Sequence, residues 1–358
     1  MYQNFLKVAA GAVLALASTA SFAQVSAPKY SNEFLHIGVG GRALGMANVQ
    51  SAITNDATAG YWNPAGLLQL QNKYNVMLMH SELFAGIVKN DFGAFATPLD
   101  SSSALAVSVI RTGVDNIADT RRLKNEYGYI QYDSIRFFSV ADYAVIVSYA
   151  RKSNLIEGLR VGANAKIIYR NVGDFANAWG FGVDAGAQLS RGNWQFGAMA
   201  KDITTTFTAW SINADELRTT YIGTENELIE NSVEITLPRL VLGVGRSFTF
   251  KERFTALVAA DLDVTFDGKR NVLLRSGFAS VDPHVGVELG YNKIVFLRGG
   301  INNIQQIKEL GGSESWKVQP NFGVGVATHG LKLDLALSKV ADNSEVSSVI
   351  VSLGYSFN

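Results

Sequence analysis

The residues best able to do chemistry in this sequence are its four histidines, His36, His80, His284 and His329. A histidine metal site places its ligands a few residues apart, and none of the four has a neighbour at such spacing. The chain also lacks a Gly-x-Ser-x-Gly elbow for a nucleophilic serine. His80 or His329 would need a serine brought beside it by the fold, and His329, next to Gly330, is better explained as a turn residue. We therefore expect no enzyme, no metal and no cofactor.

Two further patterns suggest a bound group and are incomplete. Asp261 and Asp263 are two residues apart, so on a strand both carboxylates share a face, but a cation would need other ligands. The run from Ile37 to Met46 is rich in glycine, yet the third glycine of a dinucleotide loop falls at Ala43, and no strand or helix pattern flanks it. Lys plus Arg and Asp plus Glu are both 31, and this zero net charge argues against nucleic acid as a partner.

The N-terminus is typical of an exported bacterial protein. Lys7 precedes a short apolar run, and Ser21-Phe22-Ala23 suits a signal peptidase, which predicts a cleaved signal over residues 1–23. The run is too short for a membrane-spanning helix. The chain has no cysteine, so it has no disulfide, no thiolate metal site and no cysteine-linked lipid anchor.

The elements that must position any functional residue are strands. In 331–338 every second residue is leucine, and the residues between them are Lys332, Asp334, Ala336 and Ser338. Such alternation gives each strand one apolar and one polar face. We predict about fourteen strands, at 73–83, 87–97, 103–112, 137–150, 159–171, 178–189, 193–201, 238–249, 253–265, 283–291, 293–301, 319–329, 331–339 and 346–357. Many of them are long enough to cross a bilayer at a tilt, which takes about 9–11 residues.

The connections alternate between long and short. The long ones, 113–136, 202–237, 266–282 and 302–318, all follow odd-numbered strands, and the even connections are tight. Long loops on one side and short turns on the other are typical of outer-membrane barrels. The segment Val272 to Val281 is a candidate for one more strand. Tyr149, Tyr169, Tyr291 and Tyr355 lie near strand ends, as in an aromatic girdle, and Phe357 ends the last strand. The fold class is therefore all-β, a transmembrane antiparallel up-and-down barrel in the cell outer membrane.

Residues before the first strand have a different pattern. Residues 30–71 show no sustained alternation and are too apolar for disorder, so we expect them to plug the lumen as a hatch. The predicted domains are residues 1–23 as signal, 24–71 as N-terminal extension and hatch, and 72–358 as the barrel. In Tyr61-Trp62-Asn63-Pro64-Ala65-Gly66-Leu67, Asn63-Pro64 starts a turn, Trp62 is an anchor whose N–H needs a partner, and Gly66 takes a backbone angle that other residues avoid. The turn either holds a movable hatch or only fills the lumen.

Alternation also predicts which charged residues face the lumen. They are Arg160, Lys166, Arg170, Asp184, Asp261, Asp263, Glu288, Lys332 and Asp334. They either line a path for a solute or pair with one another around the hatch. We favour pairing, because both signs are mixed.

The hatch segment resembles the N-terminal region of the PorV/PorQ family, which is itself similar to the FadL-type transporters of hydrophobic compounds. The resemblance rests on Gly38, Gly40, Gly41, Arg42 and Gly45 in the first run, and on Trp62, Asn63, Pro64 and Gly66 in the second. It implies a fourteen-stranded barrel with an N-terminal hatch. The rest of the chain matches in length and strand pattern.

The resemblance also implies two alternative functions. The first is a role in the type IX secretion system of Bacteroidetes-like bacteria, with a translocon barrel and the C-terminal domains of secreted cargo as partners, met by loops 113–136 and 202–237. The alternative is a FadL-like transporter of small hydrophobic molecules, with an apolar pocket near the outer face and a lateral gap where the hatch meets the wall. A diffusion porin is disfavoured, since a plug would block its channel. Outer-membrane lipid is a partner in each case.

Overall fold

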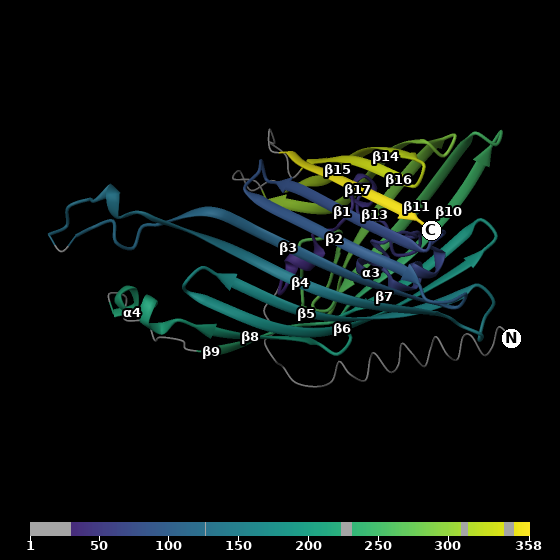
Figure 1. The fold of residues 1–358 in the computed structure, drawn as a ribbon. Coiled ribbons are helices and arrows are strands. Elements are labelled where there is room, and N and C mark those ends of the chain that lie inside the picture. The colour runs from purple at the N-terminus through teal and green to yellow at the C-terminus, as the bar shows by residue number, and fades with distance from the viewer. Residues whose placement is uncertain (1–29, 126, 223–230, 309–313, 340–346) are drawn as a thin grey trace.

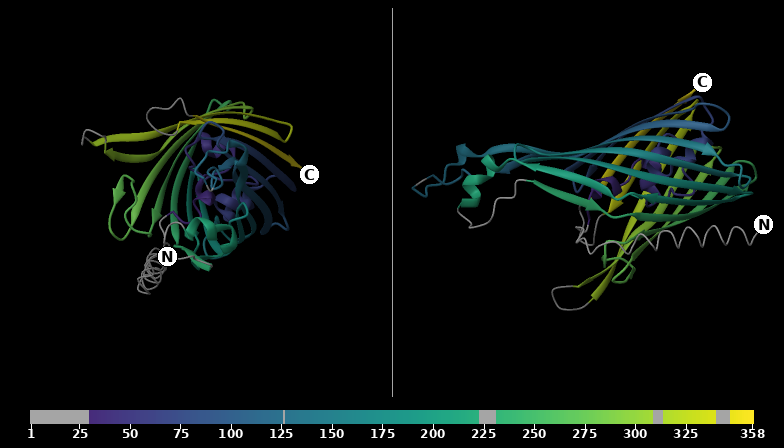
Figure 2. Two further views of the ribbon diagram at one scale, coloured as in Figure 1. Left: turned by 90° about the vertical axis from the view of Figure 1, so that its left-hand side faces the viewer. Right: turned by 90° about the horizontal axis from the view of Figure 1, so that it is seen from below.

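The chain folds as a closed antiparallel barrel with fourteen strand positions, as predicted (Figures 1 and 2). The computed structural model describes residues 30–125, 127–222, 231–308, 314–339 and 347–358. The predicted signal over residues 1–23 lies outside them. No helix within these ranges is long and apolar enough to cross a membrane.

The strands follow one another around the barrel. They are β1 (Tyr74–Leu83), β2 (Val88–Pro98), β3 (Ser103–Asp119), β4 (Arg136–Lys152), β5 (Leu159–Val172), β6 (Ala176–Arg191), β7 (Trp194–Lys201), β8 (Thr206–Ile212), β9 (Asn231–Thr236), β10 (Arg239–Phe250), β11 (Phe254–Thr265), β12 (Leu274–Arg275), β13 (Ser280–Tyr291), β14 (Val295–Lys308), β15 (Glu314–Thr328), β16 (Leu331–Lys339) and β17 (Ser347–Phe357). Strands β7 and β8 share one wall position, β9 and β10 share the next, and β12 pairs only with the outer part of β13. Pairing of β1 with β17 closes the wall.

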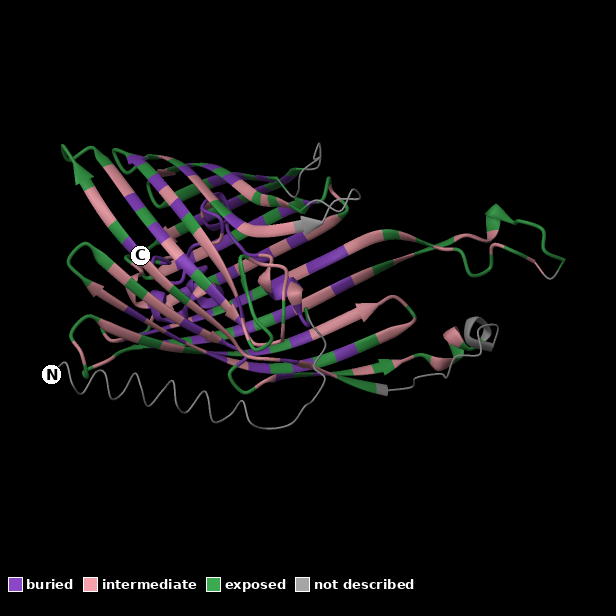
Figure 3. Cartoon of the chain, turned by 180° about the vertical axis from the view of Figure 1, so that it is seen from behind, coloured by how far each residue is buried: buried purple, intermediate pink, exposed green. Residues whose placement is uncertain are grey.

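The two ends of the barrel differ as predicted. Short turns such as 99–102, 192–193 and 329–330 lie at one end, called here the turn end, and the other end is the loop end. Side chains alternate along each strand between the lumen and the exposed outer surface, which Figure 3 shows as bands of colour. Tyr149, Tyr291 and Tyr355 face outward near the turn end.

The connections predicted as long loops contain more structure than the sequence indicated. Residues 113–119, 302–308 and 314–318 continue strands, and 202–237 contains β8, α4 (Ala214–Ile222) and β9. Strands β3 and β4 thus extend as a long hairpin beyond the barrel, with η3 (Tyr132–Ser134) near its tip (Figure 1). The extra strand predicted over Val272 to Val281 is only the two-residue β12, because Ser280 onward belongs to β13.

Residues 30–71, called here the lumen segment, pack inside the barrel (Figure 2). They form four short helices, η1 (Glu33–His36), α2 (Gly41–Gly45), α3 (Ala59–Trp62) and η2 (Pro64–Gln69). Apolar side chains of this segment, such as Leu67 and Val39, form a core with inward residues of the wall, such as Ile110 and Ile168. The interior is therefore a packed core, since a filled lumen buries the apolar faces of both partners.

Candidate functional site

The Trp62-Asn63-Pro64 turn fastens the lumen segment to the wall. Asn63 is fully buried, and its Nδ2 donates to the carbonyl oxygens of Ser51, at 2.8 Å, and Ala187 of β6, at 3.0 Å. Its Oδ1 accepts from the backbone N–H of Ala65, which caps η2 behind Pro64. The indole N–H of Trp62 donates to the Val39 carbonyl oxygen at 3.0 Å, which supplies the hydrogen-bond partner expected for this side chain.

The signature glycines are required for close approach more than for unusual backbone angles. Gly38 and Gly40 do have positive φ, of 104° and 87°. Gly66 does not, so the predicted reason for that glycine is wrong: a Cβ there would lie 2.4 Å from the Thr54 carbonyl oxygen. Gly45 likewise lies against the Cα of Gly323 on β15.

The wall meets the lumen segment with glycines of its own. We call them the glycine belt: Gly162, Gly186, Gly197, Gly243, Gly286 and Gly300. A Cβ at Gly197 would lie 2.2 Å from the Ser51 carbonyl oxygen, and one at Gly286 would lie 2.6 Å from that of Met46. Backbone therefore packs on backbone along several strands, which holds the lumen segment in one position.

Three of the predicted residues join Arg298 in a buried ion network, namely Arg42, Glu288 and Asp334. Glu288 accepts from Arg42 Nε at 2.9 Å and from Arg298 Nε at 2.6 Å, and Arg298 Nη1 reaches Asp334 at 2.6 Å. Arg42 also contacts Asn55. Two cations and two carboxylates balance, which buried charges require.

The other predicted lumen charges pair mostly in separate clusters. Lys166 lies between Asp184 and Asp202, at 2.7 and 2.6 Å. Arg170 pairs with Asp142 and Glu234, at 2.9 and 3.3 Å.

Arg160 and Lys332 depart from this pattern. Arg160 donates to the hydroxyl of Ser190 at 2.8 Å. Lys332 is exposed near the turn end and does not line the packed interior, because β16 begins there at the rim.

Asp261 and Asp263 do not converge on a cation. Asp261 accepts the backbone N–H groups of Gln50 and Ser51, at 2.9 and 3.0 Å. Asp263 pairs with Arg239 instead. In the described part of the chain, no three His, Asp or Glu side chains gather as metal ligands would.

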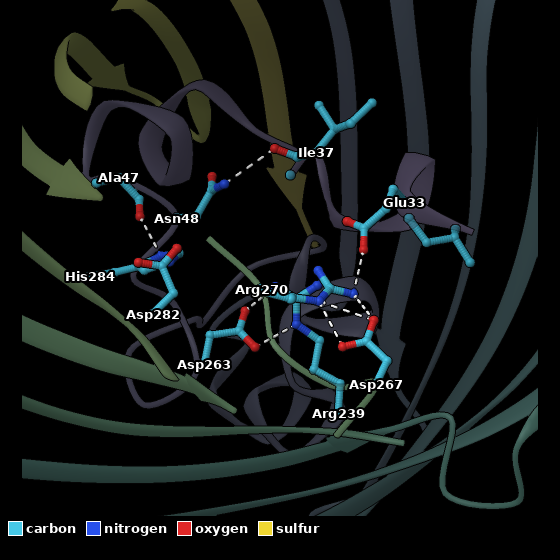
Figure 4. Close-up of polar contacts among 12 residues, drawn as sticks. Glu33, Ile37, Ala47, Asn48, Arg239, Asp263, Asp267, Arg270, Asp282 and His284 are labelled. Atoms are coloured by element: carbon cyan, nitrogen blue, oxygen red, sulfur yellow. Dashed lines mark hydrogen bonds and ion pairs between the residues drawn. The ribbon is translucent and has the colours of Figure 1, made fainter. Parts of the chain in front are cut away.

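The open part of the lumen is a cavity of about 430 Å³ at the loop end. One side carries ion pairs, of Arg239 with Asp263 and of Arg270 with Asp267 and Glu33 (Figure 4). Strands β14 to β17 add uncharged amides and hydroxyls, those of Asn302, Gln319, Asn321, Ser338 and Ser348. Apolar contacts come from Ile37, Leu44, Leu83, Phe84 and Ile350. The lining is therefore amphiphilic.

Several polar groups at this cavity lack a protein partner. Arg239 Nη1 and Asn48 Oδ1 are buried and make no hydrogen bond within the described residues. His36, at the cavity floor, is kept neutral, because burial and the nearby charge of Arg239 lower its pKa well below the usual value.

The wall is interrupted beside this cavity. Residues 202–205 separate β7 from β8, and Leu237-Pro238 separates β9 from β10, so the ladder breaks between the pairs Arg239–Lys201 and Thr236–Thr206. Pro238 has no N–H to continue a ladder. A small cavity of about 20 Å³ lies at Pro238 and shares His36, Arg239 and Arg270 with the large one.

Sequence reasoning missed Arg298, Arg239, Asp202 and the glycine belt. The lumen-facing position of Arg298 could have been predicted from alternation, since its neighbour Leu297 on β14 faces outward. The positions of Asp202 and Arg239 could not be predicted in this way, because both flank the interruption of the wall, where alternation stops.

A lumen filled by an N-terminal segment inside a fourteen-stranded wall defines a plugged barrel of the outer-membrane type. Comparison with solved structures finds the same fold in FadL-like barrels. The Pseudomonas putida toluene transporter TodX matches with a TM-score of 0.58 at 14% identity, covering 90% of this chain and 98% of that one. The Ralstonia pickettii toluene transporter TbuX matches with a TM-score of 0.56 at 12% identity, covering 90% of this chain and 99% of that one. A Pseudomonas aeruginosa FadL homologue matches with a TM-score of 0.51 at 12% identity, covering 89% of this chain and 98% of that one.

These likenesses concern the fold, since the identities are low. No protein-family model matches the chain, and the search of curated proteins gave no significant match. The similar structures are transporters and channels, not enzymes. They show the predicted FadL-like barrel fold.

Proposed function

We propose that this protein is an outer-membrane channel for small amphiphilic molecules, exported through a cleaved signal at residues 1–23. The observation that carries the proposal is the cavity of about 430 Å³ at the loop end, a size suited to a small ligand. Its mixed lining favours a compound with an apolar body and polar groups over a bare hydrocarbon. The packed lumen segment below and the wall interruption at Pro238 support a sideways exit from the cavity.

The absence of cysteine from the sequence permits a clean test. In a Gln319→Cys variant, a bulky maleimide attached after folding would fill the cavity. We expect it to abolish uptake of a fluorescent aromatic amphiphile by proteoliposomes. The control is Val258→Cys, which places the same label on the outward face of β11. Equal uptake by labelled and unlabelled Gln319→Cys would refute the cavity as the route.

The secretion role is the second candidate, and the projecting β3–β4 hairpin is the observation in its favour. Tyr127, Tyr129 and Tyr132 near its tip are 84%, 71% and 72% exposed, and tyrosines of this kind are frequent in protein-binding surfaces. Affinity purification of the tagged chain from native membranes separates the two roles. A translocon barrel or secreted proteins with a common C-terminal domain would support secretion, whereas the barrel alone with a bound amphiphile would support transport.

A further inference from the structure

The outward face of β1, β2 and β3 carries an unusual group of charged side chains. We call it the rim cluster, and it consists of His80, Glu82, Lys89, Asp91, Arg111 and Asp115. His80 faces Asp91 across the β1–β2 ladder, and Asp91 faces Arg111 across the β2–β3 ladder. These side chains alternate with lumen-facing Met79, Ser81 and Asn90, so they point away from the barrel interior.

The rim cluster is held together by ion pairs of its lysine and arginine with carboxylates and by a hydrogen bond of its histidine. His80 Nδ1 lies 2.6 Å from Asp91, and Arg111 contacts Asp91 at 3.4 Å and Asp115 at 3.7 Å. Lys89 reaches Asp115 at 3.0 Å. The side chains of His80 and Asp91 remain 54% and 42% exposed, so the cluster is accessible from outside.

The cluster shortens the apolar outer surface at these strands. On β5 the outward residues stay apolar from Leu159 to Tyr169. On β1 the outward series Tyr74, Val76, Leu78 ends at His80. Charge on the lipid-facing side of a barrel costs more free energy the deeper it lies in the bilayer, so the cluster marks where the apolar outer surface of these strands ends.

A groove of about 560 Å³ begins beside the cluster and runs over the outer wall. Its apolar lining comes from Leu78, Val109, Val351 and Leu353, and His80, Asp91 and Arg111 form one end. Gly93 lies in the groove, where a side chain would otherwise fill it; the nearest atom to a Cβ there is a Leu78 methyl, 3.6 Å away. The groove is thus apolar along its length and charged at one end.

We propose that this groove binds one molecule of a zwitterionic glycerophospholipid, with an acyl chain over Gly93 and the headgroup on the rim cluster. Arg111 and His80 would meet the phosphate, and the nearby carboxylates of Glu82 and Asp91 would meet the ammonium group. A purely anionic headgroup fits less well, because Lys89 and Arg111 already have carboxylates beside them. The inference rests on the proposed membrane location but not on the transported compound.

The test is native mass spectrometry of the delipidated barrel in a neutral detergent, with phosphatidylethanolamine or phosphatidylglycerol of equal chain length. We expect one phosphatidylethanolamine per barrel and weaker retention of phosphatidylglycerol. Gly93→Leu should abolish retention. Arg111→Gln should weaken it about tenfold or more, the factor for losing a hydrogen bond to a charged group.

Gly299→Leu is the matched control, since Gly299 is an outward wall glycine of β14 whose nearest atom to a Cβ lies 4.0 Å away. It should retain lipid like the unchanged chain, and heat-modifiable electrophoretic mobility would confirm folding of every variant. Three outcomes would overturn the proposal. The first is equal retention of the two lipids, and the second is retention of lipid by Gly93→Leu. The third is a barrel dimer that is lost in Gly93→Leu, because the groove would then bind a second copy of the chain. Loss of amphiphile uptake with lipid retention intact would instead count against the transport function alone.

Discussion

Arg298 is the residue on which the largest buried ion network depends. Its side chain joins Glu288 to Asp334 and is 3% exposed. Replacing it by methionine leaves two carboxylates with Arg42 as their one remaining cation within the network. We expect Arg298→Met to lower the free energy of unfolding by about 3–5 kcal/mol, measured by urea titration of the barrel in liposomes.

Arg160→Met provides the comparison for Arg298. Arg160 has a neutral hydroxyl partner, Ser190, so its loss should cost about 1 kcal/mol. Equal effects of the two substitutions would mean that the network around Glu288 contributes no more than one ordinary hydrogen bond.

Gly197 of the glycine belt permits direct contact of wall backbone with lumen-segment backbone. A methyl group there would overlap the Ser51 carbonyl, which cannot rotate away as a side chain could. We expect Gly197→Ala to lower the free energy of unfolding by roughly 1–3 kcal/mol. Gly299→Ala, on the open outer surface, should change it little, and a loss of similar size in both variants would contradict the argument.

For single residues, the sequence predicted which ones matter in the lumen segment better than it predicted what each of them does. Asn63 and Trp62 were recognised as a turn and an anchor from their chemistry alone. Gly66 was recognised too, but the reason for it was spatial, because the Thr54 carbonyl that approaches it is twelve residues away. The partners of Glu288 come from the lumen segment and from β14, and spacing along one strand does not reveal them.

The β3–β4 hairpin is the element best suited to testing how the barrel is oriented in the membrane. Arg122 and Lys124 near its tip are exposed, whereas Lys152 is exposed at the opposite, turn end. If the loop end faces outward, trypsin added to intact cells should cut after Arg122 or Lys124 and leave Lys152 uncut until the outer membrane is opened. Fragment masses give the sites, and a variant with Arg122→Gln and Lys124→Gln should resist cleavage there. Cleavage at Lys152 in intact cells would reverse the assignment.

Strand positions were predictable wherever one face of the strand contacts apolar surroundings. The boundaries of β5, β16 and β17 agree with the sequence prediction to within about two residues. The prediction failed for 113–119, because both faces of a hairpin beyond the barrel are in contact with water and alternation disappears. The register shift between Val114 and Ile117 disturbs the pattern further.

On the scale of the whole molecule, strand count and closure followed from the sequence, but the cavity did not. The count depends on repeated alternation, which every wall position displays. The cavity collects residues from the lumen segment, β1, β10, β11 and β13 to β17, and only the closed wall brings these together. Its amphiphilic character was therefore not foreseeable from any single segment, although a pocket near the outer face was expected of a FadL-like barrel.

The seam between β1 and β17 has a consequence for assembly order. These strands pair from Tyr74 with Phe357 to Glu82 with Val349, and the lumen segment leads directly into β1. The wall therefore cannot shut until the strand furthest along the chain has arrived, and a chain that stopped before β17 would leave one edge of β1 without a hydrogen-bonded partner.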